Sequence, residues 1–137
     1  MEIVINGIFI YSKTILLIRK ERNRRSNWIF PGGKPQPREE DLDCLNRELK
    51  EELPYFKFGG NFCPYCKIRG ISSTRNIPLE LRAYMFNGFC NNDFRTSSRP
   101  EEPIKEARIF NYNDALTLEI SDITSRIIQK LKLDNLV

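Results

Sequence analysis

Three glutamates in one segment have a spacing that could hold a metal ion: Glu51 follows Glu48 by three residues, and Glu52 follows it by four. Residues at these spacings are neighbours on a helix surface, with Cβ atoms about 5–6 Å apart. Three like charges this close would destabilise an isolated helix unless Arg47 and Lys50, or a bound cation, compensate them. Carboxylate oxygens are hard ligands, so the expected cation is Mg²⁺, with Mn²⁺ as a substitute. The same side chains could also form the solvated face of an amphipathic helix.

The composition narrows the available chemistry, because the 137 residues include no histidine. This excludes Ser-His-Asp and Cys-His nucleophile pairs, His-ligated zinc and histidine general bases. Acid–base catalysis must therefore rest on carboxylates, Lys, Tyr or Cys. The net charge of +4 suits anionic small molecules as well as nucleic acid, so charge alone does not choose between them.

Four cysteines raise the question of a thiolate metal site. Cys63 and Cys66 have the spacing of half a zinc site or of a redox pair. A four-thiolate site that adds Cys44 and Cys90 stays open, but reduced structural cysteines in a cytoplasmic protein are favoured. No apolar stretch approaches the roughly 20 residues of a membrane span, and the N-terminus does not resemble a signal peptide. We therefore expect a cytoplasmic protein without membrane association.

The length predicts a single domain over residues 1–137. Four leucines at positions 42, 45, 49 and 53 predict one apolar stripe on a helix over about 40–53. The remaining expected elements are a hairpin of 3–10 and 14–19, a charged loop 20–27, a short strand 28–30, strand-like pieces within 55–71, a strand 79–87, a polar loop 91–103, a strand 104–111 and a helix 121–133. Strands interleaved with two helices favour a mixed sheet with helices on both sides.

The segment from Gly33 to Tyr55 resembles the Nudix box, the signature of the Nudix hydrolase family. Its matching residues, at the family's offsets, are Gly33, Glu39, Arg47, Glu48, Glu51 and Glu52. The flanking segments 28–33 and 105–110 also resemble regions that many members carry. Pro54 replaces the last glycine of the box, so we expect an altered helix exit and unchanged carboxylates. Glu40 stands where Ser or Thr often caps the helix, so the cap should be weak.

The resemblance implies an α/β/α sandwich with a mixed sheet between helices, and a metal site. In this interpretation Glu48, Glu51 and Glu52 hold one or more divalent ions together with the Gly33 carbonyl oxygen. Glu52 is also a candidate general base. Arg47 orients the glutamates by pairing with Glu39 or Glu51.

The implied activity is hydrolysis of a P–O–P linkage in a nucleoside diphosphate derivative. The favoured substrates are a (deoxy)nucleoside triphosphate or a nucleotide sugar such as ADP-ribose. The alternative is a non-catalytic Nudix-fold module that binds a nucleotide or RNA, but such modules usually lose box glutamates. We expect a small-molecule nucleotide substrate and no stable nucleic-acid partner. Capped RNA as a substrate and a homodimer both stay open.

Substrate contacts are less strongly indicated. Arg22, Arg24 and Arg25 could bind phosphates or belong to an ordinary solvated loop. Arg82 lies on a predicted strand that could form the floor of a pocket. Two pairs complete the set of candidates: Glu101 and Glu102 as an extra metal ligand or base, and Phe89 and Phe94 as stacking partners of a base.

Overall fold

The computed structural model describes residues 1–72, 76–97 and 99–137. Its elements are, in chain order, β1 (Glu2–Ile8), β2 (Ile10–Tyr11), β3 (Thr14–Arg22), β4 (Arg25–Ile29), β5 (Gly32–Gly33), α1 (Asp41–Glu52), β6 (Phe58–Ile71), β7 (Pro78–Cys90), β8 (Ile104–Phe110), α2 (Tyr112–Ala115) and α3 (Asp122–Leu133). Within the described residues, no helix is long and apolar enough to cross a membrane.

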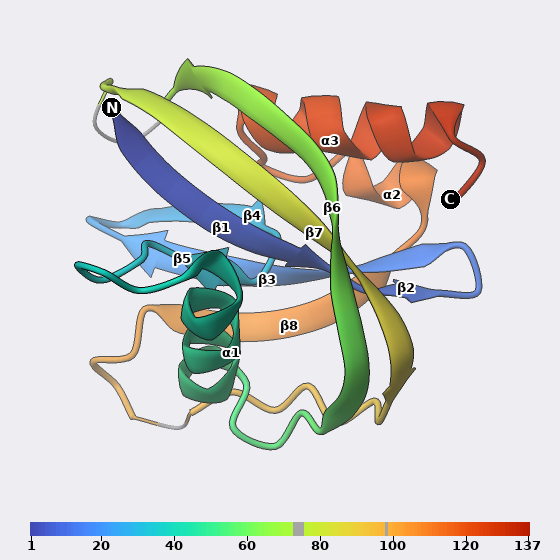
Figure 1. Cartoon of the computed structure of the whole chain (residues 1–137), viewed down its shortest axis with the longest axis horizontal. Helices are drawn as coiled ribbons and strands as arrows, with labels where there is room; N and C mark the ends of the chain where they lie inside the picture. Colours follow the sequence, from blue (N-terminus) through green and yellow to red (C-terminus); the bar gives the residue numbers. More distant parts are fainter. Residues whose placement is uncertain (73–75, 98) are drawn as a thin grey trace.

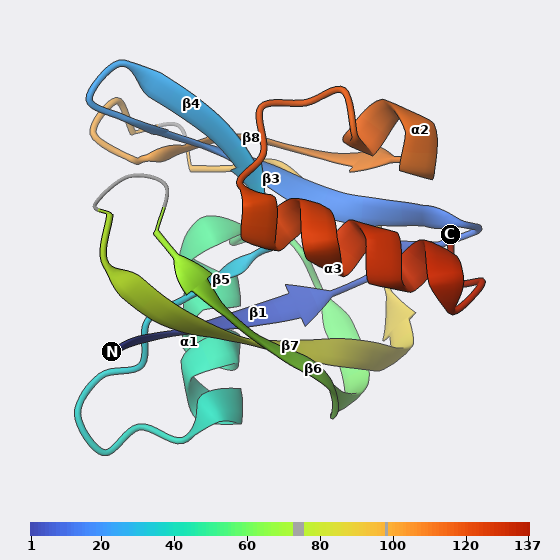
Figure 2. The ribbon, with the colours of Figure 1, turned by 90° about the horizontal axis from the view of Figure 1, so that it is seen from above.

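The strands form two sheets between helices. Sheet A has the order β5-β1-β7-β6, and it is mixed because β1 and β7 are parallel while its other pairs are antiparallel. In sheet B, β3 pairs antiparallel with β2, β4 and β8. Helices α1 and α3 lie on opposite sides of the strands (Figure 1), and the view from above shows α3 running along the sheets (Figure 2). The predicted sandwich of a mixed sheet between helices is confirmed.

The core lies on both sides of β3. Ile15 and Leu17 belong to the apolar cluster that includes α3, whereas Leu16 and Ile18 belong to the cluster that includes α1. Successive side chains of a strand point to opposite faces, so a strand covered on both sides must be apolar at every position. The continuous run from Ile15 to Ile18 in the sequence is explained by this double burial.

Helix α1 forms where its periodicity predicts, with one difference on its apolar side. Leu45, Leu49 and Leu53 are buried, but Leu42 is 39% exposed and does not belong to the stripe. Glu40 makes no side-chain capping bond, as expected. The helix ends at Leu53, which leaves the helical conformation with φ of −130° and ψ of 74°. The following Pro54 disfavours the helical region for the residue before it.

Three expectations about the strands are wrong in detail. The run 3–10 does not form one arm of a hairpin: β1 joins sheet A, and only β2 pairs with β3. The charged segment 20–27 is not a loop but a tight hairpin, in which Asn23 and Arg24 have φ of 51° and 65°. Pro64 does not break β6, because the strand lies at the edge of sheet A and absorbs it in a bulge. The expected polar loop 91–103 has no helix or strand among its described residues, which leave out residue 98.

Candidate active site

Glu52, in the last turn of α1, is the most buried of the three glutamates. Its side chain is 5% exposed, and its Oε1 accepts a 3.0 Å hydrogen bond from the backbone N–H of Gly32 in β5. Burial raises the pKa of Glu52 well above its usual range; the Gly32 N–H and the charge of Lys20 oppose this rise, and Glu48 adds to it. A carboxylate whose pKa is raised by burial is a stronger base than an exposed glutamate.

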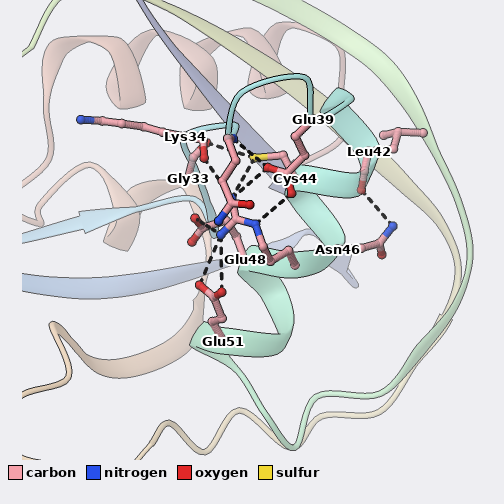
Figure 3. Close-up of polar contacts among 10 residues, drawn as sticks. Gly33, Lys34, Glu39, Leu42, Cys44, Asn46, Glu48 and Glu51 are labelled. Carbon is pink, nitrogen blue, oxygen red and sulfur yellow. Dashed lines mark hydrogen bonds and ion pairs between the residues drawn. The ribbon is translucent and has the colours of Figure 1, made fainter.

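Arg47 organises the rest of the acidic face, to which Glu39, Glu48 and Glu51, labelled in Figure 3, belong. Its guanidinium binds both carboxylate oxygens of Glu39 at 2.9 and 3.0 Å. It also donates to Glu48 at 3.0 Å and to Glu51 at 3.5 Å, and to the Lys34 carbonyl oxygen at 3.0 Å. The hydrogen bonds from Arg47 lower the pKa of Glu39 to about 2. The predicted pairing of Arg47 with Glu39 and Glu51 is therefore present, and it joins α1 to the segment after β5.

Gly33 is required where α1 approaches β5. A Cβ at this position would come 2.5 Å from Oε1 of Glu48, so any side chain would displace that carboxylate. The Gly33 carbonyl oxygen accepts a weak hydrogen bond from the Cys44 thiol, with a sulfur–oxygen distance of 3.7 Å. Burial raises the pKa of Glu48, against the influence of Arg47. The structure thus places Gly33 against the carboxylate of Glu48.

The donor types at this place fit a hard divalent cation, because they are carboxylate oxygens and a backbone carbonyl oxygen. In the structure the carboxylates are engaged with Arg47 and Gly32, and Glu51 is 59% exposed. Across the described ranges, no three His, Cys, Asp or Glu side chains gather as a metal-binding group. The four cysteines are free, with Cys63 exposed on β6.

The glutamates open onto a cavity of about 480 Å³. Its charged lining residues are Glu2, Lys20, Arg22, Arg25, Lys34, Glu48, Glu51, Glu52 and Glu102. Of the basic residues, Lys34 pairs with Glu2. Arg22 and Arg25 lie opposite one another in the β3–β4 hairpin, and within the described part of the chain neither side chain forms a hydrogen bond or ion pair. Their charges are therefore available to an anionic ligand.

Lys20 and Glu102 show how tertiary structure completes the site. Burial and the charge of Arg22 lower the pKa of Lys20, which interacts with Glu52 and Glu48. Glu102, fifty residues after Glu52 in the sequence, lies close enough to raise the pKa of Glu52. The sequence did not identify Lys20 as a site residue, because it does not reveal which strand faces the helix. Its only indication was a place in a charged segment.

Other predicted contacts lie elsewhere. Arg82 is not among the residues that line the cavity; it forms ion pairs with Asp41 at 3.2 Å and with Glu80 at 2.8 Å. Glu101 does not line the cavity either. Phe89 is 82% exposed on β7, and Phe94 packs with the cluster under α1. The cavity walls described here contain no aromatic side chain, so a ligand would meet aliphatic surfaces.

Comparison with known proteins places these features in a family. The NUDIX domain model matches residues 3–131. No curated protein matches the chain. Three solved structures illustrate the likeness, which at these identities concerns the fold alone.

The MutT NUDIX hydrolase from Burkholderia pseudomallei is 20% identical, with 93% of this chain and 95% of that chain covered and a TM-score of 0.75. The MutT protein from Methanosarcina mazei Go1 is 16% identical, with 98% and 94% covered and a TM-score of 0.76. The NUDIX domain of Shewanella oneidensis NrtR, complexed with ADP ribose, is 14% identical, with 98% and 88% covered and a TM-score of 0.66. Since the family model matches nearly the whole chain, the chain belongs to the NUDIX domain family.

Proposed function

We propose that the protein is a Nudix hydrolase that uses water and a divalent cation, Mg²⁺ or Mn²⁺, to cleave the P–O–P linkage of a nucleoside diphosphate derivative. The observation that carries the proposal is that Glu48, Glu51 and Glu52 line the same cavity as Arg22 and Arg25, whose side chains have no partner among the described residues. A diphosphate requires such a combination, because its oxygens need cationic partners while its cleavage needs a bound metal and a proton acceptor.

Each residue has a distinct part in this proposal. When bound, a divalent cation would neutralise the diphosphate and lower the pKa of a water molecule. Glu48, Glu51, Glu52 and the Gly33 carbonyl oxygen would supply its ligands. Arg47 is a positioning residue, because it fixes Glu48 and Glu51 through hydrogen bonds.

Two carboxylates are candidates for the general base. Glu52 would accept the proton of the attacking water, since burial raises its pKa and makes its carboxylate the stronger base. Glu102 is the second candidate, because it lines the same cavity.

The favoured substrates are a (deoxy)nucleoside triphosphate or a nucleotide sugar such as ADP-ribose. A cavity of about 480 Å³ falls within the range of about 300–1,000 Å³ that small-molecule sites occupy. The ADP ribose complex of the NrtR domain supports a nucleotide ligand for this fold.

The proposal is tested by product analysis with purified protein and Mg²⁺. The substrate panel contains common and oxidised nucleoside triphosphates, ADP-ribose, sugar nucleotides, dinucleotide cofactors and a capped RNA. We expect one class to be hydrolysed preferentially, and its products to identify the broken bond. Binding without turnover of any member would contradict the proposal and support a non-catalytic nucleotide-binding module.

Replacing Gly33 by alanine should weaken activity without unfolding the protein. The added Cβ must displace the Glu48 carboxylate, and disturbing the support of a metal ligand costs about 10–100-fold in metal affinity or activity. The measurement is the Mg²⁺ dependence of turnover. Gly59→Ala is the matched control, since a Cβ there meets nothing within 4 Å. Equal metal dependence of the two variants would remove Gly33 from the proposed site.

Replacing Arg25 by methionine should lower kcat/KM, mainly by raising KM. A hydrogen bond to a charged group contributes about 1.5–3 kcal/mol, which corresponds to about 10–100-fold. Arg24→Met is the control, because Arg24 lies in the same exposed turn but does not line the cavity. Steady-state kinetics on the preferred substrate compares them. If both variants lost activity equally, the loss would come from the reduced positive charge of the hairpin, and a specific contact between Arg25 and phosphate would be contradicted.

A further inference from the structure

Asn6 is a polar residue buried in the wall of the cavity. It lies on β1, its side chain is 4% exposed, and it lines the cavity without taking part in the proposed metal chemistry. Its Nδ2 donates to the carbonyl oxygens of Phe30 at 3.1 Å, Ile5 at 3.3 Å and Pro31 at 3.5 Å. An oxygen in that place would face three acceptors, so these contacts fix the orientation of the amide.

The other end of the amide, Oδ1, has no partner. No donor in the described part of the chain reaches it. Among the described residues, every side-chain nitrogen or oxygen atom that is fully buried has a hydrogen-bond partner. The Oδ1 of Asn6 must therefore have accessible surface, and the opening that Asn6 reaches is the cavity. A ligand that covers this oxygen without donating to it leaves an unsatisfied acceptor, which is unfavourable.

Asn6 marks the inner end of the cavity. Along β1 the residues that line it are Glu2, Val4 and Asn6, and the next residue on that face, Ile8, is fully buried in the core. Glu2 lies at the mouth, where it pairs with Lys34. Lys34 thus lies at the mouth, and Asn6 is the last residue on this face of β1 that reaches the cavity.

Aliphatic side chains form part of the cavity walls. Val4 pairs with Leu81 of the parallel strand β7, and both line the cavity. Ile29 from β4 and Ile123 from α3 also line it. A flat apolar group with a polar edge fits such walls, whereas a phosphate does not. In a nucleotide, the group of this kind is the base.

We propose that Asn6 is a specificity-determining residue that reads the nucleobase, its Oδ1 accepting a hydrogen bond from an exocyclic amino group. The inference rests on the proposed function for the nucleotide class of the ligand. Because Nδ2 is occupied, Asn6 offers only an acceptor toward the cavity. A base that places a C–H group there leaves Oδ1 unpaired, and one that places a carbonyl oxygen there sets two acceptors against each other.

The test removes the donor from the ligand and leaves the protein intact. Binding to the wild-type protein is measured by calorimetry in excess chelator for three pairs of triphosphates. The pairs are ATP with purine riboside triphosphate, CTP with 2-pyrimidinone riboside triphosphate, and GTP with ITP; each second member lacks one exocyclic amine. We expect at least one amine to strengthen binding about tenfold, the free energy of one hydrogen bond at a desolvated site. Equal affinities within all three pairs would overturn the proposal.

Two protein variants and one ligand series show whether Asn6 itself is the source of the selectivity. Asn6→Val should abolish the difference within the preferred pair, whereas Val4→Ala should weaken both members alike and preserve their ratio. A ratio that persists in Asn6→Val assigns the amine contact to another residue and overturns the proposal. The proposal is also overturned if the preferred triphosphate keeps its affinity without the amine and loses it only when the 2′- or 3′-hydroxyl is removed. Oδ1 would then accept from the ribose and not from the base. Turnover is measured separately, so that selective binding without hydrolysis supports the role of Asn6 and contradicts the proposed activity.

Discussion

Glu52→Gln should reduce turnover by about 10²–10⁴-fold, the range expected when a general acid–base group is removed. Glutamine keeps an oxygen that can accept the 3.0 Å hydrogen bond from the Gly32 N–H, so the geometry of the helix end is retained. It loses the negative charge and the capacity to take a proton. Single-turnover kinetics on the preferred substrate measures the effect. Glu40→Gln, an exposed neutralisation at the N-cap of the same helix, is the control and should retain wild-type turnover.

The same variant should change stability in the opposite direction. The folded-state pKa of Glu52 lies above its unfolded value of about 4.3, because burial disfavours the carboxylate. Its contribution to stability is therefore fully present below the unfolded pKa and is lost as the pH rises through the folded pKa. In excess chelator, Glu52→Gln should melt at a higher temperature than the wild type at pH 8 and match it at pH 4. A variant less stable at pH 8, or one with normal turnover, would contradict the assigned role of Glu52.

Removing divalent cations should lower hydrolysis to the level of a protein-free blank. The carboxylates of the box and the Gly33 carbonyl are the groups proposed to hold the cation, and the chain offers no histidine to activate water instead. Excess chelator is added during turnover, and Mg²⁺ or Mn²⁺ is then restored above the chelator concentration. Full recovery on restoration shows that the loss comes from the metal and not from denaturation.

Thermal unfolding supplies a readout of metal binding that does not depend on activity. A cation present at 100 times its Kd should stabilise the folded protein by about 2.7 kcal/mol. Glu48→Gln should reduce this stabilisation, whereas Glu40→Gln should preserve it. Turnover that persists in excess chelator, or an equal response of both variants to Mg²⁺, would refute the metal site.

Helix α1, which contains the three glutamates, could be predicted from the sequence because its pattern lies within one short segment. The spacing of Leu45, Leu49 and Leu53 predicts a helix, and the same periodicity brings Glu48 and Glu52 to one side of it. Leu42 fits the same periodicity and yet is 39% exposed in the first turn of α1. Periodicity identifies an apolar face, but only packing decides how far along the helix that face is covered.

The strands were harder to place, because their pairing depends on residues far apart in the chain. β1 pairs with β7, more than seventy residues later, and not with the neighbouring β3. Similarly, Arg22 and Arg25 were expected in a loop but belong to a two-residue hairpin that presents both to the cavity. Short positive-φ turns without glycine leave a weak signal in a sequence.

The sequence by itself determined the helix with its three glutamates, since this follows from spacing within one segment. Its resemblance to the Nudix box indicated the family and a pairing of Arg47 with Glu39 or Glu51. Tertiary structure alone decided what faces those glutamates: it brings in Lys20 and Glu102, and it turns Arg82 toward Asp41 and Glu80. It also buries Asn6 with one free oxygen in the cavity wall. The physical reason is that helical neighbours are fixed by the rise and turn of one segment. Neighbours across a cavity are fixed by the register between strands, which no single segment encodes.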